Sequence, residues 1–288
     1  MGRTGLAFCP GHISGYFLPV RTGEPVTSGS SGAGIVISEG VTVRVEPSEK
    51  PEVVIHRVES PGGPEEVIMG SPPIEYAMER LGVAAVVSTT CRLPIGAGYG
   101  LSAAALLASV HALNRLFGLG LTPDTCTAYA HEAEIVHRTG LGDVAACQGG
   151  GRDCRTGPGI HARIERAFDL KEPLVAVTFG QLLSPGILGS DEKMEQVRAA
   201  YPGRCPSDAP DFFRLSRSFA EKSGLITREV RRALIACDEA AVLASMTMLG
   251  NGVFAYGKDA SAVLGEFGKP WVLTTASGGT TLFPGDER

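Results

Sequence analysis

The stretch that most constrains the fold is a glycine-rich turn followed by an alanine-rich apolar segment, residues 93–116, LPIGAGYGLSAAALLASVHALNRL. The turn contains three alternating glycines, Gly96, Gly98 and Gly100, which permit sharp bends and close approach to a ligand. Ser102 is a suitable N-cap for a helix that is apolar on nearly every face, which predicts a buried central helix. Because the unpaired amides of its first turn and the helix dipole favour an anion, we expect a phosphate site here.

The rest of the chain reads as a mixture of strands and helices. β-branched and apolar runs predict strands at residues 35–37, 41–45, 53–58, 83–90, 173–179, 271–275 and 280–283. Caps and helical periodicity predict helices at residues 72–81, 102–117, 123–138 with Thr122 as N-cap, and 143–147, and three or four more between Asp191 and Leu249. The segment Ser28–Gly34, SGSSGAG, predicts a flexible loop. We place two α+β domains at 1–168 and 169–288.

The composition excludes several kinds of partner. The formal charge of −5 comes from interspersed acidic and basic residues, so neither nucleic acid nor an anionic membrane is expected as a partner. No apolar run is long enough to cross a bilayer. The seven cysteines are scattered and form no Cys-x-x-Cys pair, which predicts buried, reduced thiols in a cytoplasmic protein.

Three common types of glycine-rich loop do not fit the turn. A P-loop needs Lys-Ser or Lys-Thr after glycine, and neither Lys258 nor Lys269 is followed by either residue. In a dinucleotide-binding fingerprint, Leu101 would occupy the position of the third glycine. A hydrolase nucleophile at Ser102 would need a histidine late in the chain, and none follows His161.

The turn instead resembles the phosphate-binding motif of the GHMP kinases, the family of galactokinase, homoserine kinase and mevalonate kinase. It has the glycines, no lysine, and a serine leading into alanines, although only one serine stands where the motif usually has two. Other motifs of this family are matched in order by residues 10–12 (PGH), 142–143 (GD) after a helix with Glu134, and 276–280 (ASGGT). The resemblance implies a ribosomal-protein-S5-like N-terminal domain, a ferredoxin-like C-terminal domain, and an active site between them.

Within that family, three segments resemble the archaeal pantoate kinases. They are residues 9–17 (CPGHISGYF), 29–34 (GSSGAG), and 139–144 (TGLGDV) followed by 155–159 (RTGPG). The resemblance implies transfer of the ATP γ-phosphoryl group to the 4-hydroxyl of (R)-pantoate in coenzyme A biosynthesis, and a homodimer. The alternatives are a GHMP kinase acting on homoserine, mevalonate or shikimate, and a nucleotide-binding regulator without catalysis.

Phosphoryl transfer needs a cradle for the nucleotide and a metal ion. We predict that ATP is bound by Pro94, Gly96, Ala97, Gly98, Tyr99, Gly100, Leu101, Ser102 and Ala103. Mg²⁺ takes oxygen ligands and keeps several waters, so one hydroxyl and one carboxylate suffice. We assign these to Ser102 and Glu134, with Glu132 as the competing carboxylate.

The remaining polar residues near these motifs predict the acceptor site. Asp143 stands between glycine and a small-residue helix, and we assign it as the base or the orienting group for the substrate hydroxyl. Arg155 offers a planar fork that suits the pantoate carboxylate. His131 lies one helical turn before Glu134 on the same face, and Ser28 can donate to a substrate oxygen. His12 is expected only near the entrance of the site.

Overall fold

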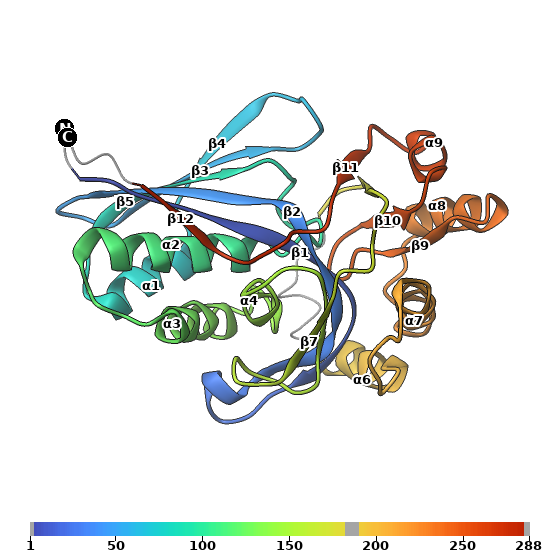
Figure 1. Cartoon of the computed structure of the whole chain (residues 1–288), viewed down its shortest axis with the longest axis horizontal. Helices are drawn as coiled ribbons and strands as arrows, with labels where there is room; N and C mark the ends of the chain where they lie inside the picture. The colour runs from blue at the N-terminus through green and yellow to red at the C-terminus, as the bar shows by residue number, and fades with distance from the viewer. Residues whose placement is uncertain (1–2, 182–189, 285–288) are drawn as a thin grey trace.

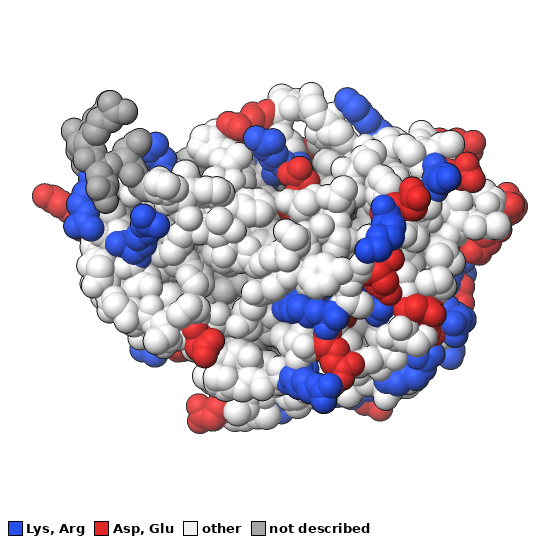
Figure 2. Space-filling model, in the orientation of Figure 1, with Lys and Arg blue, Asp and Glu red and all other residues white. Residues whose placement is uncertain are grey.

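The computed structural model describes residues 3–181 and 190–284, which form two β-sheets with helices packed against each (Figure 1). This arrangement confirms the predicted α+β class. The described helices include none with the length and apolar character needed to span a membrane. On the face shown in Figure 2, positive and negative side chains are interspersed and no basic stripe crosses the surface.

The larger sheet contains eight strands, in the order β12-β1-β2-β5-β3-β4, with β6 paired to β2 and to β7. Strand β3 runs parallel to β5, and the other pairs are antiparallel. The strands are β1 Gly5–Val20, β2 Gly29–Pro47, β3 Glu52–Val58, β4 Glu65–Met69, β5 Ala85–Cys91, β6 Arg152–Arg155, β7 Ile164–Ala167 and β12 Thr281–Phe283. The predicted strand ranges include none for β1, β4, β6 or β7.

One face of this sheet is covered by helices, as Figure 1 shows. They are α1 Pro72–Leu81, α2 Leu101–Phe117, α3 Pro123–Val136 and the short α4 Asp143–Ala146. Helix α2 is the buried central helix that the sequence predicts, and its small residues let it approach the sheet closely. A Cβ at Gly5 would lie only 2.7 Å from the Ala112 carbonyl oxygen. Gly82 ends α1, and the predicted cap Thr122 is confirmed, because it accepts from the Thr125 amide at the start of α3.

The smaller sheet is antiparallel, in the order β11-β8-β10-β9. Its strands are β8 Leu174–Thr178, β9 Leu243–Met246, β10 Gly252–Tyr256 and β11 Trp271–Leu273. Helices α6 Asp191–Ala200, α7 Ala209–Lys222 and α8 Arg228–Glu239 precede β9, and α9 Ala260–Gly265 precedes β11. This β-α-β-β-α-β order with an antiparallel sheet is the ferredoxin-like pattern. The expectation of helices up to residue 249 was wrong for β9.

The predicted flexible loop at residues 28–34 is wrong, because Gly29 onward belongs to β2. This part of β2 pairs with β1 on one side and with β6 on the other. A Cβ at Gly32 would lie 2.3 Å from the Tyr16 carbonyl oxygen, and one at Gly34 would lie 2.1 Å from His12 Nε2. The glycines therefore permit close contact between strands instead of providing flexibility.

The last described strand returns to the larger sheet. Strand β12 pairs with β1, with Leu6 opposite Phe283 and Phe8 opposite Thr281. The predicted unit 169–288 therefore contributes one strand to the sheet of the first half. Because β12 forms the edge of that sheet beside β1, the larger sheet contains strands from both halves of the chain.

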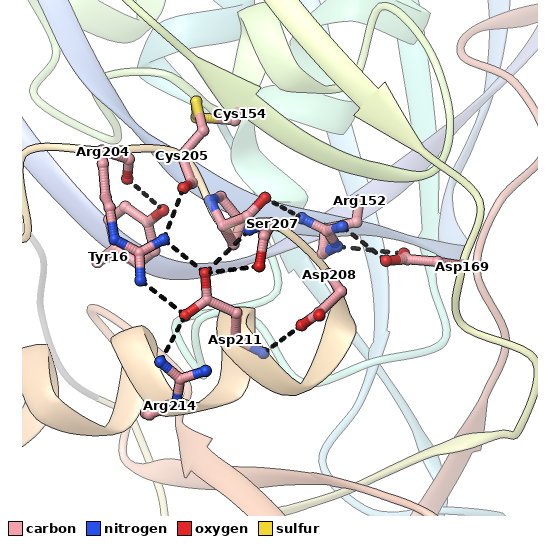
Figure 3. A network of polar contacts seen from close by, with 11 residues as sticks. Tyr16, Arg152, Cys154, Asp169, Arg204, Cys205, Ser207, Asp208, Asp211 and Arg214 are labelled. Carbon is pink, nitrogen blue, oxygen red and sulfur yellow. Dashed lines mark hydrogen bonds and ion pairs between the residues drawn. A yellow bond between two sulfur atoms is a disulfide. The ribbon is translucent and has the colours of Figure 1, made fainter.

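The prediction that all cysteines are reduced is wrong for one pair. Cys154 of β6 and Cys205, between α6 and α7, form a disulfide with a Cα–Cα distance of 5.8 Å (Figure 3). The five other cysteines are buried free thiols, as predicted. The partners lie 51 residues apart with no recognisable spacing, so only the tertiary fold could reveal the pair.

A polar network fixes the segment that carries Cys205 (Figure 3). The buried carboxylate of Asp211 accepts hydrogen bonds from Arg204 and from Ser207, and pairs with Arg214. The hydrogen bond from Arg204 is the main reason that the pKa of Asp211 lies below its usual value. Since the Tyr16 hydroxyl donates to the Arg204 carbonyl at 2.9 Å, the network also joins this segment to β1.

We expect Cys205→Ser to lower the free energy of unfolding by about 4 kcal/mol, the chain-entropy value for a loop of 51 residues. Urea unfolding of the two proteins without reductant measures the difference. Reductant should destabilise the unchanged protein and leave the variant unaffected. Equal stability of the two proteins under oxidising conditions would show that the disulfide contributes nothing.

Candidate active site

A cavity of about 280 Å³ lies where the two halves of the chain meet. Its wall comes from β1, β2, the loop of residues 95–100, the start of α2, the segment 139–143 and the turn after β9. Ser102 and Asp143, which are 41 residues apart in sequence, both line it. The structure thus brings the glycine-rich loop and the predicted catalytic carboxylate to one cavity.

The loop owes its shape to its alternating glycines. Gly96, Gly98 and Gly100 have φ values of 78°, 84° and 62°, in the left-handed region that side chains disfavour. Gly100 is the N-cap residue of α2, so the predicted cap role of Ser102 is wrong. Ser102 instead occupies the second helical position and lines the cavity.

Backbone from both halves of the chain encloses the loop. A Cβ at Gly98 would lie 2.9 Å from the Met248 carbonyl oxygen, and one at Gly250 would lie 2.1 Å from the Ala97 carbonyl oxygen. On the other side, the His12 amide donates to the Tyr99 carbonyl at 2.9 Å. The turn between β9 and β10 thus supports the loop. Its Gly-Asn-Gly sequence was the available signal for this role, which sequence reasoning missed.

Most residues of the predicted nucleotide site line the cavity: Gly96, Gly98, Tyr99, Gly100, Leu101, Ser102 and Ala103. Pro94 and Ala97 do not line it. Ala97 is buried against the turn at Gly250. The Tyr99 ring is buried as well and packs against Trp271, with ring centroids 6.3 Å apart. The predicted set therefore divides into residues that face the cavity and residues that hold the loop in place.

Asp143 is the first residue of α4, and its side chain is 22% exposed. Its Oδ1 accepts from His12 Nδ1 at 2.6 Å and from the Ser14 hydroxyl at 3.4 Å. Burial alone would raise the pKa of Asp143, but the bond to His12 and the positive charges of His12 and Arg155 lower it below its usual value. Asp143 is therefore an ionised carboxylate at the cavity wall.

The His12 ring is held between two carboxylates. Its Nδ1 faces Asp143, and its Nε2 lies 2.7 Å from Oδ1 of the buried Asp153. A neutral ring has a single N–H and could donate to only one of them, so with both carboxylates ionised this geometry needs the imidazolium form. Burial would lower the pKa of His12, but the two carboxylates outweigh it and raise the pKa. Sequence reasoning placed His12 only near the entrance and did not identify Asp153.

Arg155 does not lie on the cavity wall, where its predicted role would put it. It is 1% exposed and donates from Nη1 to Oδ2 of Asp153. Its buried Nε has no hydrogen-bond partner among the described residues. A Cβ at Gly142, which lines the cavity, would lie 3.1 Å from that Nε. Arg155 thus lies directly behind one residue of the wall.

Ser28 and His131 are close together but also outside the cavity wall. His131 Nε2 donates to the Ser28 carbonyl oxygen at 2.9 Å, and both residues are buried. The Ser28 hydroxyl accepts from the Thr22 amide at 3.0 Å and donates to the Glu24 carbonyl at 2.9 Å. The structure therefore brings Ser28 and His131 together, but by contacts within the protein.

Glu134 is buried, and neither carboxylate oxygen accepts a hydrogen bond from the described residues. The His131 Nδ1 lies 3.4 Å from Oε2 without hydrogen-bond geometry. Burial raises the pKa of Glu134; the nearby His131 ring opposes this increase, and the negative charge of Asp143 adds to it. Glu132, the competing candidate, instead binds Arg80 and the Tyr76 hydroxyl.

A buried carboxylate without hydrogen bonds is costly unless a cation or donor compensates it. Glu134 has the His131 ring as an ion-pair partner at 3.4 Å but no hydrogen bond from the described residues, so its oxygens leave room for a metal ion, whereas Glu132 already has its partners. Ser102 lies on the cavity wall and Glu134 lies behind Gly140, whose Cβ would be 2.3 Å from Glu134 Oε1. Of the two predicted metal ligands, only Ser102 lines the cavity.

Comparisons with known proteins agree with this geometry. The model for the N-terminal domain of GHMP kinases matches residues 73–151. The chain is 48% identical to a pantoate kinase from Methanospirillum hungatei over 98% of this chain and 97% of that protein. It is 33% identical to a pantoate kinase from Thermococcus kodakarensis over 89% and 88% of the two chains.

A solved structure described as a phosphotransferase related to the coenzyme A biosynthesis pathway superimposes with a TM-score of 0.79. It is 25% identical to this chain, and the match covers 97% of this chain and 98% of that one. The sequence matches and the fold therefore agree over nearly the whole length. The chain belongs to the pantoate kinase family of the GHMP kinases.

Proposed function

We propose that the protein transfers the γ-phosphoryl group of ATP to the 4-hydroxyl of (R)-pantoate, giving 4-phosphopantoate for archaeal coenzyme A biosynthesis. One observation carries the mechanism: the glycine-rich loop at the start of α2 and the ionised Asp143 line the same cavity. Family membership supplies the substrate class. Phosphoryl transfer depends mainly on positioning and electrostatic stabilisation, which this arrangement suits.

The loop of residues 96–100 is proposed to bind the triphosphate. Its backbone amides and the N-terminal amides of α2 supply donors, and the helix dipole favours negative charge there. A second cavity, of about 100 Å³, adjoins the first and shares Ile95, Leu101 and Ser102 with it. Because its wall includes the apolar side chains of Ile55 and Ile74, we propose that it receives the adenine ring.

Asp143 is proposed to orient the accepting hydroxyl. An ionised carboxylate accepts a hydrogen bond from the hydroxyl and directs its oxygen toward the γ-phosphorus. A carboxylate with a lowered pKa is a weak base, so orientation is favoured over early deprotonation. Since the transition state for phosphoryl transfer is loose, the hydroxyl does not need to lose its proton before attack.

The acceptor end of the cavity is proposed to lie along residues 139–142. Arg155 remains our candidate for the pantoate carboxylate, because its Nε is unpartnered in the described structure and lies just behind Gly142. Ser28 and His131 remain candidates for the same region. Phe17 and Leu141 line the cavity there and offer apolar surface for the geminal dimethyl group.

Ser102 and Glu134 are proposed to hold Mg²⁺ with ATP, and the lack of hydrogen bonds to the Glu134 oxygens from the described residues supports this assignment. When bound, the ion would neutralise charge that develops on the phosphates.

We also propose that the protein is a cytoplasmic homodimer. Strand β4 supports the dimer because it exposes apolar side chains at the edge of the sheet, Val67 at 56% and Met69 at 61%. Light scattering after gel filtration tests it.

We expect Glu134→Gln to lower kcat about a hundredfold and to raise the Mg²⁺ concentration needed for half-maximal activity, because a neutral amide is a weaker ligand for a hard cation. Steady-state rates across a Mg²⁺ titration measure both effects. Glu132→Gln is the matched control, since it lies on the same helix and contacts Arg80 instead. Similar losses in both variants would contradict the assignment.

The function is tested by ADP release with pantoate, homoserine, mevalonate and shikimate in parallel, and by phosphorus NMR of the product. We expect turnover on pantoate at least a hundredfold above that on the other acids. Turnover on homoserine or mevalonate equal to that on pantoate would assign the chain a different acceptor. Absence of phosphoryl transfer to any of them would contradict a kinase.

A further inference from the structure

Behind the cavity, four charged side chains form a linear series of alternating sign: Asp143, His12, Asp153 and Arg155. Asp143 and His12 both line the cavity, but only Asp143 is appreciably exposed, at 22%, and the other three are almost completely buried. Asp153 and Arg155 come from β6, His12 from β1 and Asp143 from α4. Four residues from three elements thus connect the cavity wall to the interior of the sheet.

The backbone around His12 is shaped to hold this ring. A Cβ at Gly34 would lie 2.1 Å from Nε2 and 2.5 Å from Cε1, so any other residue there would displace the ring. Gly34 is also the cross-strand partner of Asp153. The ring is therefore confined by β2, the strand that pairs with the strand of Asp153, and it cannot rotate without losing both hydrogen bonds.

We propose that Asp153 is a positioning residue for phosphoryl transfer: it holds the His12 imidazolium so that Nδ1 donates to Oδ1 of Asp143, leaving Oδ2 for the acceptor hydroxyl. This inference rests on the proposed function. Both hydrogen bonds that the described residues make to Asp143 end on Oδ1. Arg155, in turn, compensates the buried charge of Asp153.

This arrangement makes activity depend on pH through His12. The ring faces Asp143 of α4 and Asp153 of β6, and the other charged or titratable groups close to this series are Arg155, Arg166, Cys9 and Cys147. The carboxylates raise the pKa of His12 above its ordinary value of 6.5. The imidazolium is therefore present below the raised pKa, and its contribution is lost as the pH rises through it.

The test compares Asp153→Asn with the unchanged enzyme between pH 6 and 9. Without the carboxylate, burial lowers the pKa of His12. We expect the alkaline limb of kcat to move at least one unit toward lower pH, with about a tenfold loss of kcat at pH 8 that diminishes toward pH 6. The KM for pantoate should change less than threefold. Asp169→Asn is the matched control, because it removes the carboxylate partner of Arg152 on the same strand.

Three results would overturn the inference. The first is an equal loss of kcat at every pH, as expected for a purely structural role. The second is an unchanged pH profile with a raised KM for pantoate, which would mean that Asp153 acts through Arg155 on pantoate binding. The third is retention of full activity at pH 8. Failure of the proposed function would differ from all three, because the unchanged protein would then transfer no phosphoryl group to pantoate.

A second measurement applies even if Asp153→Asn does not fold. Carbon-13 NMR of ring-labelled histidine in the full-length protein resolves the titration of its six histidines, and His12→Gln identifies the His12 signal. We expect the His12 signal to titrate above 6.5, the ordinary value for histidine. A His12 signal that titrates at or below 6.5 would contradict the inference without any measurement of activity.

Discussion

Asp143→Asn is expected to lower kcat about a thousandfold, within the range for a group that orients or deprotonates a reacting hydroxyl. The side-chain amide of the variant is neutral, so it no longer holds the acceptor hydroxyl through a charge-assisted hydrogen bond. It also presents an N–H group, which cannot accept the hydrogen bond that His12 Nδ1 donates. The KM for ATP should change little because the glycine-rich loop is untouched. Single-turnover transfer from radiolabelled ATP measures the chemical step directly.

Asp124→Asn is the control for this substitution. Asp124 is also an acidic residue in the first turn of a helix, but it is exposed and lies on α3 away from the cavity. We expect that variant to retain normal kcat. If Asp143→Asn folds normally and keeps most of its kcat, Asp143 has no part in the chemical step.

Gly98→Ala is expected to weaken ATP binding at least a hundredfold. The residue has a φ of 84°, which L-residues disfavour, and the added Cβ would lie 2.9 Å from the Met248 carbonyl oxygen and from Thr247 Cβ. Because these atoms belong to a tight turn of the second half, the loop must move toward the cavity. Titration with a fluorescent ATP analogue measures the affinity.

Gly118→Ala separates backbone strain from this collision. Gly118 ends α2 with a φ of 62°, and no atom lies within 4 Å of a Cβ placed there. It should therefore cost about 1 kcal/mol of stability and leave ATP binding unchanged. Equal losses of ATP affinity in the two variants would show that strain alone, and not the packing of the loop, decides binding.

Local patterns predicted most of the elements in the first half of the chain. The apolar segment after the glycines became α2, and Thr122 capped α3, because helix caps and periodicity depend on residues a few positions apart. The order of the motifs indicated the family, and the matching relatives confirmed it. The prediction of a flexible loop at residues 28–34 was wrong because glycine occurs both in loops and where two strands approach closely.

Long-range contacts decided what the patterns could not. The disulfide of Cys154 and Cys205 joins positions 51 residues apart, and the Asp153 carboxylate meets His12 across 141 residues. Neither pair has a spacing that distinguishes it from other cysteines or acids in the sequence. The roles of Ser28, His131, Glu134 and Arg155 stay predictions, and the structure adds that these residues are buried and do not line the cavity.

The amino-acid order alone was enough to indicate the α+β class, the central helix with its phosphate loop, and the family. These features depend on short-range backbone preferences and on motifs that can be recognised in the sequence alone. The charged series behind Asp143 and the turn that supports the loop emerged only when the chain had folded. Burial and the approach of distant strands set the pairing and ionisation of such groups, and neither is encoded in any local stretch.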